Sequence, residues 1–228
     1  GVQTCALPIW AISSSDFKID GTVSNLIAFL LVNDERSTFN ADFVSGKIDL
    51  DELLINKSAT TSQDTSYKLK LNPRMSGQLN VSIGNLKFRK FNAQKVSGKV
   101  QLIDQSLIGK GLRFQAMQGD IGMDAVINAS RKDSVIISCD AQMNRLDIRQ
   151  LFYELENFDQ DVMTDRNVKG KLTADIRFAS TWGKDLGCNY DRIYAQSTLR
   201  IDEGELNNFE PLLAVSDRKS TRLNSSHR

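Results

Sequence analysis

The chain of 228 residues is poor in the side chains that most often carry chemistry: it has three cysteines and a single histidine, His227. His227 lies in a basic, Ser-rich C-terminal stretch. Without histidine elsewhere, the Ser-His-Asp and Cys-His arrangements and most zinc sites are excluded for the rest of the chain. No Gly-rich phosphate loop, calcium loop or C-x-x-C motif occurs. We therefore predict no catalytic residue, no metal site and no cofactor.

Long hydrophobic runs are absent as well. The longest apolar run, residues 26–32, is far shorter than the roughly 20 residues that a membrane-spanning helix needs. The overall composition, with 40% hydrophobic and 25% charged residues, is ordinary for a folded chain. The length is sufficient for one domain with a sizeable core, or for part of an extended repeat.

The two ends of the chain are related through the genetic code. One codon choice for residues 217–225 is GAT CGG AAG AGC ACA CGT CTG AAC TCC, and its complementary strand encodes residues 1–9. Such an inverted terminal repeat resembles sequencing-library adapter, which has to be set aside before the fold is considered. We therefore expect translated adapter at 1–9 and at 217–228. Residues 10–216 are expected to be a β-rich fragment of a larger protein.

The charge balance depends on these ends. Without Asp217 and the four basic residues of the C-terminal stretch, Lys and Arg fall from 29 to 25 and Asp and Glu from 28 to 27, so the formal net charge changes from +1 to −2. No Lys/Arg cluster of the kind that binds nucleic acid remains. We predict no nucleic-acid partner.

Two cysteines remain between the ends, and both a disulfide and two free thiols are open possibilities. Cys139 falls on the apolar side of an alternating segment, which predicts a small core residue. Cys188 is predicted to lie in a loop, with only Lys184 nearby as a basic partner.

Apolar and polar residues alternate through most of the chain from about residue 67. Turn signals such as Asn72-Pro73 and Gln118-Gly119-Asp120 separate the alternating segments at hairpin spacing. This period is typical of strands that bury one face. We therefore predict a mainly β fold: an elongated, twisted antiparallel sheet, a meander curling into a groove, with one or two short helices. The alternating segments are 67–71, 79–83, 112–116, 121–127, 135–143 and 172–178.

One segment has helical periodicity. Ile148, Leu151, Phe152 and Leu155 form an apolar stripe after Asp147, which is suited to be the N-cap. We predict a short helix over 147–155 that closes one end of the groove. Capping the core is favoured over binding a membrane, because the polar face is not rich in Lys and Arg. A further turn is expected at 209–214, and 24–32 is either a helix or a buried strand.

A pattern of Val, Gly and Lys returns three times, at 44–50, 96–102 and 168–174. The unequal intervals leave two interpretations open: a degenerate repeat, or a common way to open a strand. In either case each glycine is expected inside a strand, at a bulge, a bend or a close approach of two backbones.

Carboxylates are the remaining candidates for catalysis, because a pair of them can hydrolyse glycosides. Asp49 and Asp51 are expected to share one strand face at a solvated edge. Surface charge is therefore the favoured interpretation of both acidic clusters, which are Asp49/Asp51/Glu52 and Asp202/Glu203/Glu205.

The most recognisable phrases are LDIRQLFYELENFDQ at 146–160, NVKGKLTA at 167–174 and LRIDEGELNNFEPL at 199–212. With NAQKVSGKV at 92–100 and QGDI at 118–121, they resemble the AsmA-like family, in particular its members from Bacteroidota. The resemblance covers about 37–216 and is most specific after residue 146. These phrases are signatures of a fold and not of a chemistry.

That resemblance implies a large envelope protein of Gram-negative bacteria, anchored by an inner-membrane helix outside this segment and projecting a β-sheet groove into the periplasm. It implies phospholipid or another acyl-chain ligand, and a non-enzymatic role in outer-membrane biogenesis or in phospholipid transport between the two membranes. The alternative is a structural or protein-binding β-domain whose apolar face is a closed core, and a glycosidase is a distant third. The residues expected to line a lipid groove are Leu112, Phe114, Ile121, Met123, Ile127, Val135, Ile137, Leu172, Ile176 and Phe178.

Overall fold

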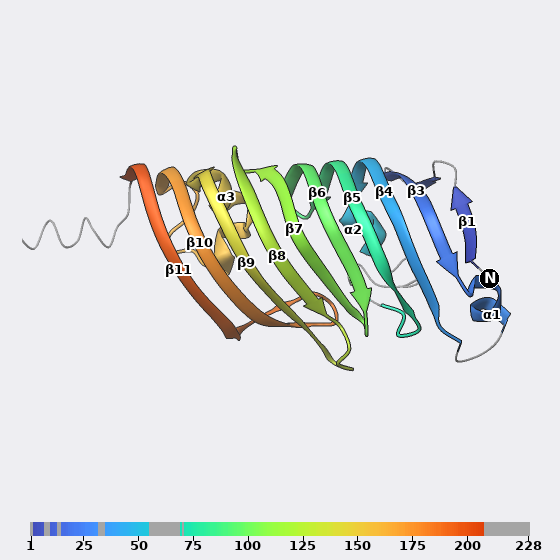
Figure 1. Cartoon of the computed structure of the whole chain (residues 1–228). Coiled ribbons are helices and arrows are strands. Elements are labelled where there is room, and N and C mark those ends of the chain that lie inside the picture. The colour runs from blue at the N-terminus through green and yellow to red at the C-terminus, as the bar shows by residue number, and fades with distance from the viewer. Residues whose placement is uncertain are drawn as a thin grey trace, which may run out of the picture.

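The computed structural model describes residues 2–6, 10–12, 15–31, 35–54, 69 and 71–207. This part of the chain forms a single 11-stranded sheet with a few short helices (Figure 1). The strands are β1 (Val2–Ala6), β2 (Trp10–Ile12), β3 (Ser15–Ser24), β4 (Ser37–Asp49), β5 (Met75–Phe88), β6 (Phe91–Ile103), β7 (Ser106–Ala116), β8 (Gly119–Asn128), β9 (Ser134–Asp147), β10 (Val168–Gly183) and β11 (Cys188–Leu206). The helices are α1 (Leu26–Leu31), α2 (Leu50–Leu54), α3 (Ile148–Glu154) and the 3-10 helix η1 (Glu156–Asp159).

The strands follow one another across the sheet in nearly the order of the sequence, β1-β3-β4 and on to β11, with β2 paired to β3 off this path. The predicted antiparallel meander is confirmed for every neighbouring pair except β4 and β5, which run parallel. A parallel pair needs a crossover connection, and here the chain leaves β4 through α2. Alternation could not reveal this pair, because it specifies the face of a side chain but not the direction of its strand.

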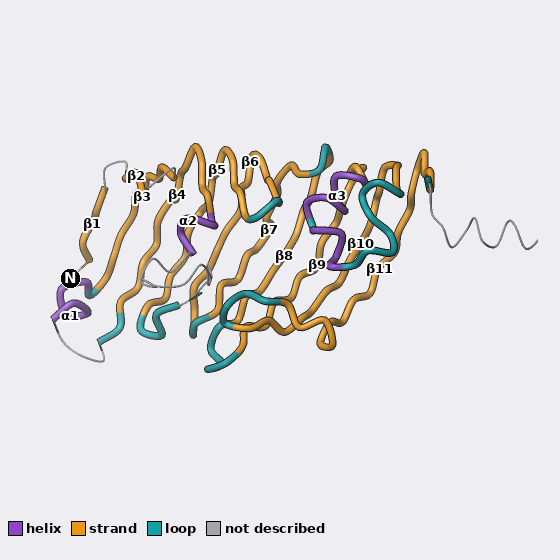
Figure 2. The backbone as a smooth tube through the Cα atoms, turned by 180° about the vertical axis from the view of Figure 1, so that it is seen from behind, coloured by secondary structure: helices purple, strands orange, loops and turns teal. Residues whose placement is uncertain are grey.

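The sheet is long and open, and its strands bend toward the side on which α2 and α3 lie (Figures 1 and 2). We call this side the inner face and the opposite side the outer face. In Figure 1 the turns that precede β7, β9 and β11 lie along the lower rim, and α3 lies near the upper rim. The predicted curling of an elongated sheet is therefore confirmed.

The alternating segments become strands, with one exception. Of the strand predicted at 67–71, only Leu69 and Leu71 are described; both lie outside any strand, and β5 begins at Met75. A turn intervenes, in which the Asn72 side-chain oxygen accepts a hydrogen bond from the Arg74 N–H at 2.9 Å and the Asn72 carbonyl accepts one from the Met75 N–H at 3.2 Å. Asn and Pro favour this geometry, and it overrides the short alternation before it.

The helix predicted at 147–155 is present as α3, Ile148–Glu154. Asp147 is the N-cap of α3, and its Oδ1 accepts a hydrogen bond from the Gln150 N–H at 3.0 Å, as predicted. The ambiguous segment 24–32 contains helix α1, whereas α2 was not predicted. The turn expected at 209–214 lies outside the described residues.

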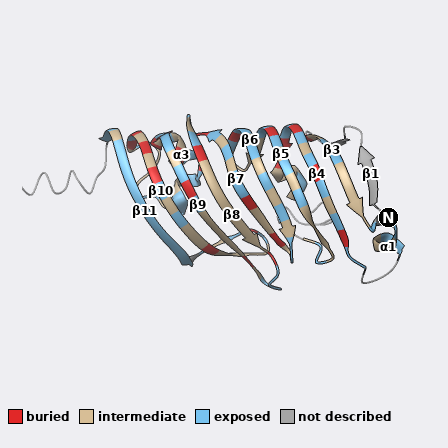
Figure 3. Ribbon diagram, viewed as in Figure 1, coloured by how far each residue is buried: buried red, intermediate tan, exposed pale blue. Residues whose placement is uncertain are grey.

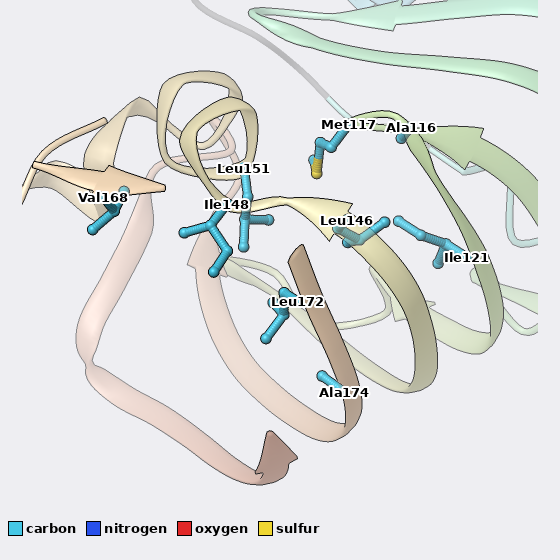
Figure 4. Packing of buried hydrophobic residues seen from close by; sticks show 9 residues of the cluster. All are labelled: Ala116, Met117, Ile121, Leu146, Ile148, Leu151, Val168, Leu172 and Ala174. Carbon is cyan, nitrogen blue, oxygen red and sulfur yellow. The ribbon is translucent and has the colours of Figure 1, made fainter. Parts of the chain in front are cut away.

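The largest buried cluster lies between α3 and the inner face (Figure 4). Leu146, at the end of β9, is fully buried, and Leu172 of β10 lies beside it. Ile148 and Leu151 of α3 close the cluster from above. Burial of each such side chain contributes about 1.5–3 kcal/mol. Helix α3 therefore caps the core at the upper rim, as predicted, but Leu155 of the predicted stripe follows the helix and is exposed.

The three V-x-G-K glycines lie inside strands, as predicted, but they are not equivalent. Gly98 and Gly170 have φ values of 146° and 136° and lie at register shifts of β6 and β10. Gly46 lies at no register shift, and its carbonyl oxygen would be 2.6 Å from a Cβ at Gly84, so there two backbones approach closely. The second and third copies share a bulge that the first copy lacks.

Candidate functional site

The inner face is the candidate site, because apolar side chains run across it from strand to strand. Residues directly opposite each other in an antiparallel pair share a face and pack together. Two such rows cross the middle of the sheet. The first is Leu112, Met123, Ala141, Ile176 and Ser197, and the second is Phe114, Ile121, Met143, Ala174 and Leu199.

All ten residues expected to line a groove lie on this face, in β7 to β10. They differ in accessibility. Ile121, Val135 and Leu172 are buried, with exposed fractions of 6%, 0% and 7%. The remaining seven, which are Leu112, Phe114, Met123, Ile127, Ile137, Ile176 and Phe178, are partly exposed.

Two glycines make room for one of these side chains. A Cβ at Gly98 would lie 2.8 Å from Leu112 Cδ2, and a Cβ at Gly109 would lie 2.5 Å from Leu112 Cδ1. Both distances are below van der Waals contact, so only glycine fits at these positions without movement of Leu112. The leucine thus lies flat across β6 and β7, and the apolar surface continues from one strand to the next.

At the upper rim, α3 and the residues around it cover part of the inner face. Phe114 packs edge-on against Phe91 with ring centroids 6.2 Å apart, beside the buried cluster. Phe152 of α3 makes a similar contact with Phe158 at 5.2 Å. Apolar residues in this region therefore contact other protein side chains.

At the lower rim, the turn between β10 and β11 is held against two other turns. The Arg89 Nη2 donates to the Leu186 carbonyl at 3.2 Å, and the Lys184 Nζ donates to the Ala129 carbonyl at 2.8 Å. Ala129 and Leu186 are both buried. Arg89 belongs to the turn between β5 and β6, which comes from the opposite rim. The two rims are thus bridged across the inner face at this point.

Strand β11 is exposed along most of its length (Figure 3). Ile193, Leu199 and Ile201 face inward, because they pair with Ser180, Ala174 and Leu172. Their exposed fractions are 41%, 56% and 54%. β11 pairs only with β10 among the described strands. The apolar surface therefore runs, accessible to solvent, to the edge of the sheet.

These β11 residues were missed by the prediction. The alternation Ile193, Ala195, Ser197, Leu199, Ile201 carries the signal of a one-sided strand. Ser197 at its centre and Tyr194 on the opposite face weaken the contrast between the two sides.

The first acidic cluster corrects the prediction of a solvated edge. Asp49 is buried and Asp51 lies in α2, so they do not share a strand face. The Lys87 Nζ lies 3.1 Å from Asp49 Oδ2 and 3.6 Å from Asp51 Oδ2. Burial alone would raise the pKa of Asp49, but the hydrogen bond and charge of Lys87 outweigh it and lower that pKa. The carboxylate stays ionised and fixes the corner between β4 and α2.

The same corner holds the turn between β5 and β6. Both carboxylate oxygens of Asp51 accept from the Arg89 N–H, at 3.0 and 2.9 Å, and Asp49 Oδ1 accepts from the Asp51 N–H at 3.1 Å. These hydrogen bonds occupy the carboxylates with backbone donors, which is a structural arrangement.

The second acidic cluster lies on the exposed part of β11. Glu205 pairs with Lys169 at 2.9 Å, which lowers the pKa of Glu205, and Asp202 pairs with Arg200 at 3.2 Å. Glu203 is exposed, with a φ of 55°. The placement agrees with the interpretation as surface charge.

Cys139 and Cys188 are free thiols. Burial, followed by the negative charge of Asp140, raises the pKa of Cys139, which lies opposite Phe178 on the inner face. Cys188 begins β11, so its predicted placement in a loop is wrong. Burial raises its pKa as well, which makes a reactive thiolate at neutral pH less abundant.

The described residues contain neither a metal-binding cluster nor a membrane-spanning helix. Within them, no three His, Cys, Asp or Glu side chains are grouped so that they could hold a metal ion. None of the described helices combines the length and the apolar character that crossing a membrane requires.

Comparison of the chain with protein-family models, with curated proteins and with solved structures finds no match. The fold itself defines a mainly β protein with an open, elongated sheet and a few short helices.

Proposed function

We propose that residues 10–216 are part of an AsmA-like envelope protein, anchored in the inner membrane outside this segment and facing the periplasm. In this proposal the chain has no enzymatic role and no cofactor. It acts in outer-membrane biogenesis or in moving phospholipid between the inner and outer membranes, with acyl chains lying along the inner face. Residues 1–9 and 217–228 are proposed to be translated adapter, which removes β1 from the natural sheet and leaves β2 as its first strand.

One observation carries the proposal: the apolar inner face continues, uncovered, to the edge strand β11. Monomeric soluble proteins rarely expose contiguous apolar surface of this kind. Acyl chains would match it chemically, because they need an apolar surface and no directional hydrogen bonds. The phrases that resemble the AsmA-like family support the same role.

A second candidate is a structural or protein-binding β-domain. The observation that favours it is the cover over part of the inner face, where Ile121, Leu146 and Leu172 are buried beneath α3. If a partner protein covered β11 in the same way, the inner face would be a closed core. The lipid-binding candidate predicts that the purified chain retains lipid, whereas the structural or protein-binding candidate predicts that it does not.

The first test is the lipid content of the purified chain, measured by mass spectrometry of an organic extract. We expect phospholipid in the wild type and at least about threefold less in Ile176→Asp and Leu199→Asp, because an ionised carboxylate is costly to bury against acyl chains. Phe114→Asp should also lose lipid, but its contact with Phe91 means that stability falls too. Leu199 is exposed, so Leu199→Asp should fold normally.

Tyr194→Asp is the matched control. Tyr194 lies on the same strand with an exposed fraction of 58%, close to the 56% of Leu199, but on the outer face. Circular dichroism would confirm that all variants fold. Absence of lipid from the wild type, or an equal loss in Tyr194→Asp, would contradict the proposal and favour the structural domain.

A further inference from the structure

A separate hollow of about 1110 Å³ lies at the lower rim. It is bounded by the segment before β5, the loop between β8 and β9, and the turn between β10 and β11. Leu71 and Ala129 give it an apolar part. Four basic residues also line it, against Asp133 as the one acidic residue of the described lining. These four are Arg74, Arg131, Lys132 and Lys184.

The four basic groups are not neutralised by protein carboxylates. Within the described part of the chain, none of them lies within 4.0 Å of an Asp or Glu oxygen. Arg74 is held instead by stacking over Phe29 at 4.6 Å and by donation to the Glu35 carbonyl at 3.5 Å. Its guanidinium is thus positioned by an aromatic ring and a carbonyl, neither of which carries a negative charge.

Lys184 is fixed in place as well. Its ammonium donates to the Ala129 carbonyl at 2.8 Å, which leaves two of its three N–H donors for another acceptor. The nearby Asp185 carboxylate accepts from the Gly187 N–H at 3.1 Å within its own turn. Two donors of Lys184 are therefore available to an acceptor bound in the hollow, which Lys184 lines.

The hollow also adjoins the inner face. Gly183, which precedes Lys184, pairs with Ser134, and Ser134 precedes the fully buried Val135 of the inner face. An anion in the hollow would thus lie near the lower end of the inner face, where Ile137 of the same strand is partly exposed. The basic hollow matches the charged head of an anionic amphiphile, and the inner face beside it matches the apolar body.

We propose that the hollow binds the phosphate group of an anionic amphiphile. Arg74, Arg131, Lys132 and Lys184 contact the phosphate oxygens, and Leu71 and Ala129 contact the adjoining carbon atoms. Arginine and lysine suit this role, because charge-assisted hydrogen bonds to phosphate are stronger than neutral ones. This inference rests on the proposed lipid function and adds a preference for an anionic headgroup.

The test is titration calorimetry of the full chain at low ionic strength with three probes. Dihexanoyl phosphatidic acid carries both the phosphate and the acyl chains, inorganic phosphate carries only the first, and dihexanoylglycerol carries only the second. The variants are Arg131→Gln with Lys132→Gln, and Lys184→Gln. Lys95→Gln with Lys99→Gln is the control, because both lysines are exposed on β6, away from the hollow.

We expect phosphatidic acid to bind most tightly, and each variant to weaken it by at least about threefold while the control leaves it unchanged. Equal affinity in wild type and both variants, or the same loss in the control, would overturn the inference. If dihexanoylglycerol binds nonetheless, the proposed function stands without this site. If inorganic phosphate binds as tightly as phosphatidic acid and dihexanoylglycerol does not bind, the hollow is a site for free phosphate and the lipid function fails.

Discussion

One row of the inner face shows two opposite environments within a single sheet. Ile121 and Ala174 have exposed fractions of 6% and 4%, whereas Leu199, next to Ala174 in the same row, is 56% exposed. All three occupy equivalent positions of one-sided strands. The difference comes from what surrounds them: α3 packs against β9 and β10, whereas Leu199 lies on β11, which pairs only with β10 among the described strands. Cover by other elements, and not the strand pattern, decides whether an apolar residue here is core or accessible surface.

The largest difference between the two regions should appear on truncating a leucine in each. Leu146→Ala removes a side chain that is 0% exposed and should lower the free energy of unfolding by about 2–5 kcal/mol. Leu199→Ala should cost less than about 1 kcal/mol, because that side chain is already largely in solvent. Urea denaturation followed by circular dichroism measures both, and equal losses would show that β11 is covered in solution.

A smaller effect is expected from the side chain that ties α3 to the sheet. The buried Glu154 accepts from the Asn92 N–H at 3.0 Å and from the Gln150 Nε2 at 2.7 Å. Glu154→Ala leaves these donors without an acceptor and should cost about 1–3 kcal/mol in urea denaturation. Glu156→Ala is the control, since Glu156 is exposed and lies 3.9 Å from Lys90. A cost for Glu156→Ala as large as for Glu154→Ala would refute the assignment.

The free energy of unfolding should depend on the ionisation of the buried Asp49. Its pKa is lowered in the folded protein, so the stability it contributes is present above the unfolded pKa of about 3.9 and is lost as pH falls through the folded pKa. Asp49→Asn should therefore flatten the decline of stability below about pH 4. Urea denaturation at a series of pH values measures this. Asp191→Asn, at an exposed residue of β11, should leave the decline unchanged, and an identical profile for both variants would contradict the prediction.

The smallest effect is expected on the outer face. Arg177 Nε lies 2.8 Å from Asp140 Oδ1, and both side chains are 67% exposed. Exposed pairs contribute between about 0 and 1 kcal/mol and are screened by salt. Arg177→Ala should therefore change the free energy of unfolding by less than about 1 kcal/mol, with any difference disappearing in 1 M salt. A salt-independent loss above that value would mean that the outer face contributes to the core.

Much of this architecture could be predicted from alternation and turn residues. The strands from β7 to β10, the inward direction of Phe114 and Ile176, and the Asp147 cap of α3 all follow from local periodicity and local hydrogen bonding. These features depend on neighbours close in sequence, so a single chain contains the information.

The remaining features depend on contacts between distant residues. Three features join segments separated by long stretches of chain. They are the parallel pair of β4 and β5, the ion pair of Lys87 with Asp49, and the hydrogen bond from Arg89 to Leu186. No local pattern distinguishes Ile121, in the cluster beneath α3, from Leu199 on the edge strand β11. The partition of the inner face into covered and open parts therefore required the structure.

We propose that the exposed inner face at β11 holds acyl chains. The most direct measurement is photocrosslinking from benzoylphenylalanine placed at Leu199 and, in a separate variant, at Tyr194, in the presence of phospholipid vesicles. We predict lipid adducts by mass spectrometry from Leu199, and few or none from Tyr194, because only Leu199 lies on the inner face. Equal labelling at the two positions, or adducts from Tyr194 alone, would contradict the claim.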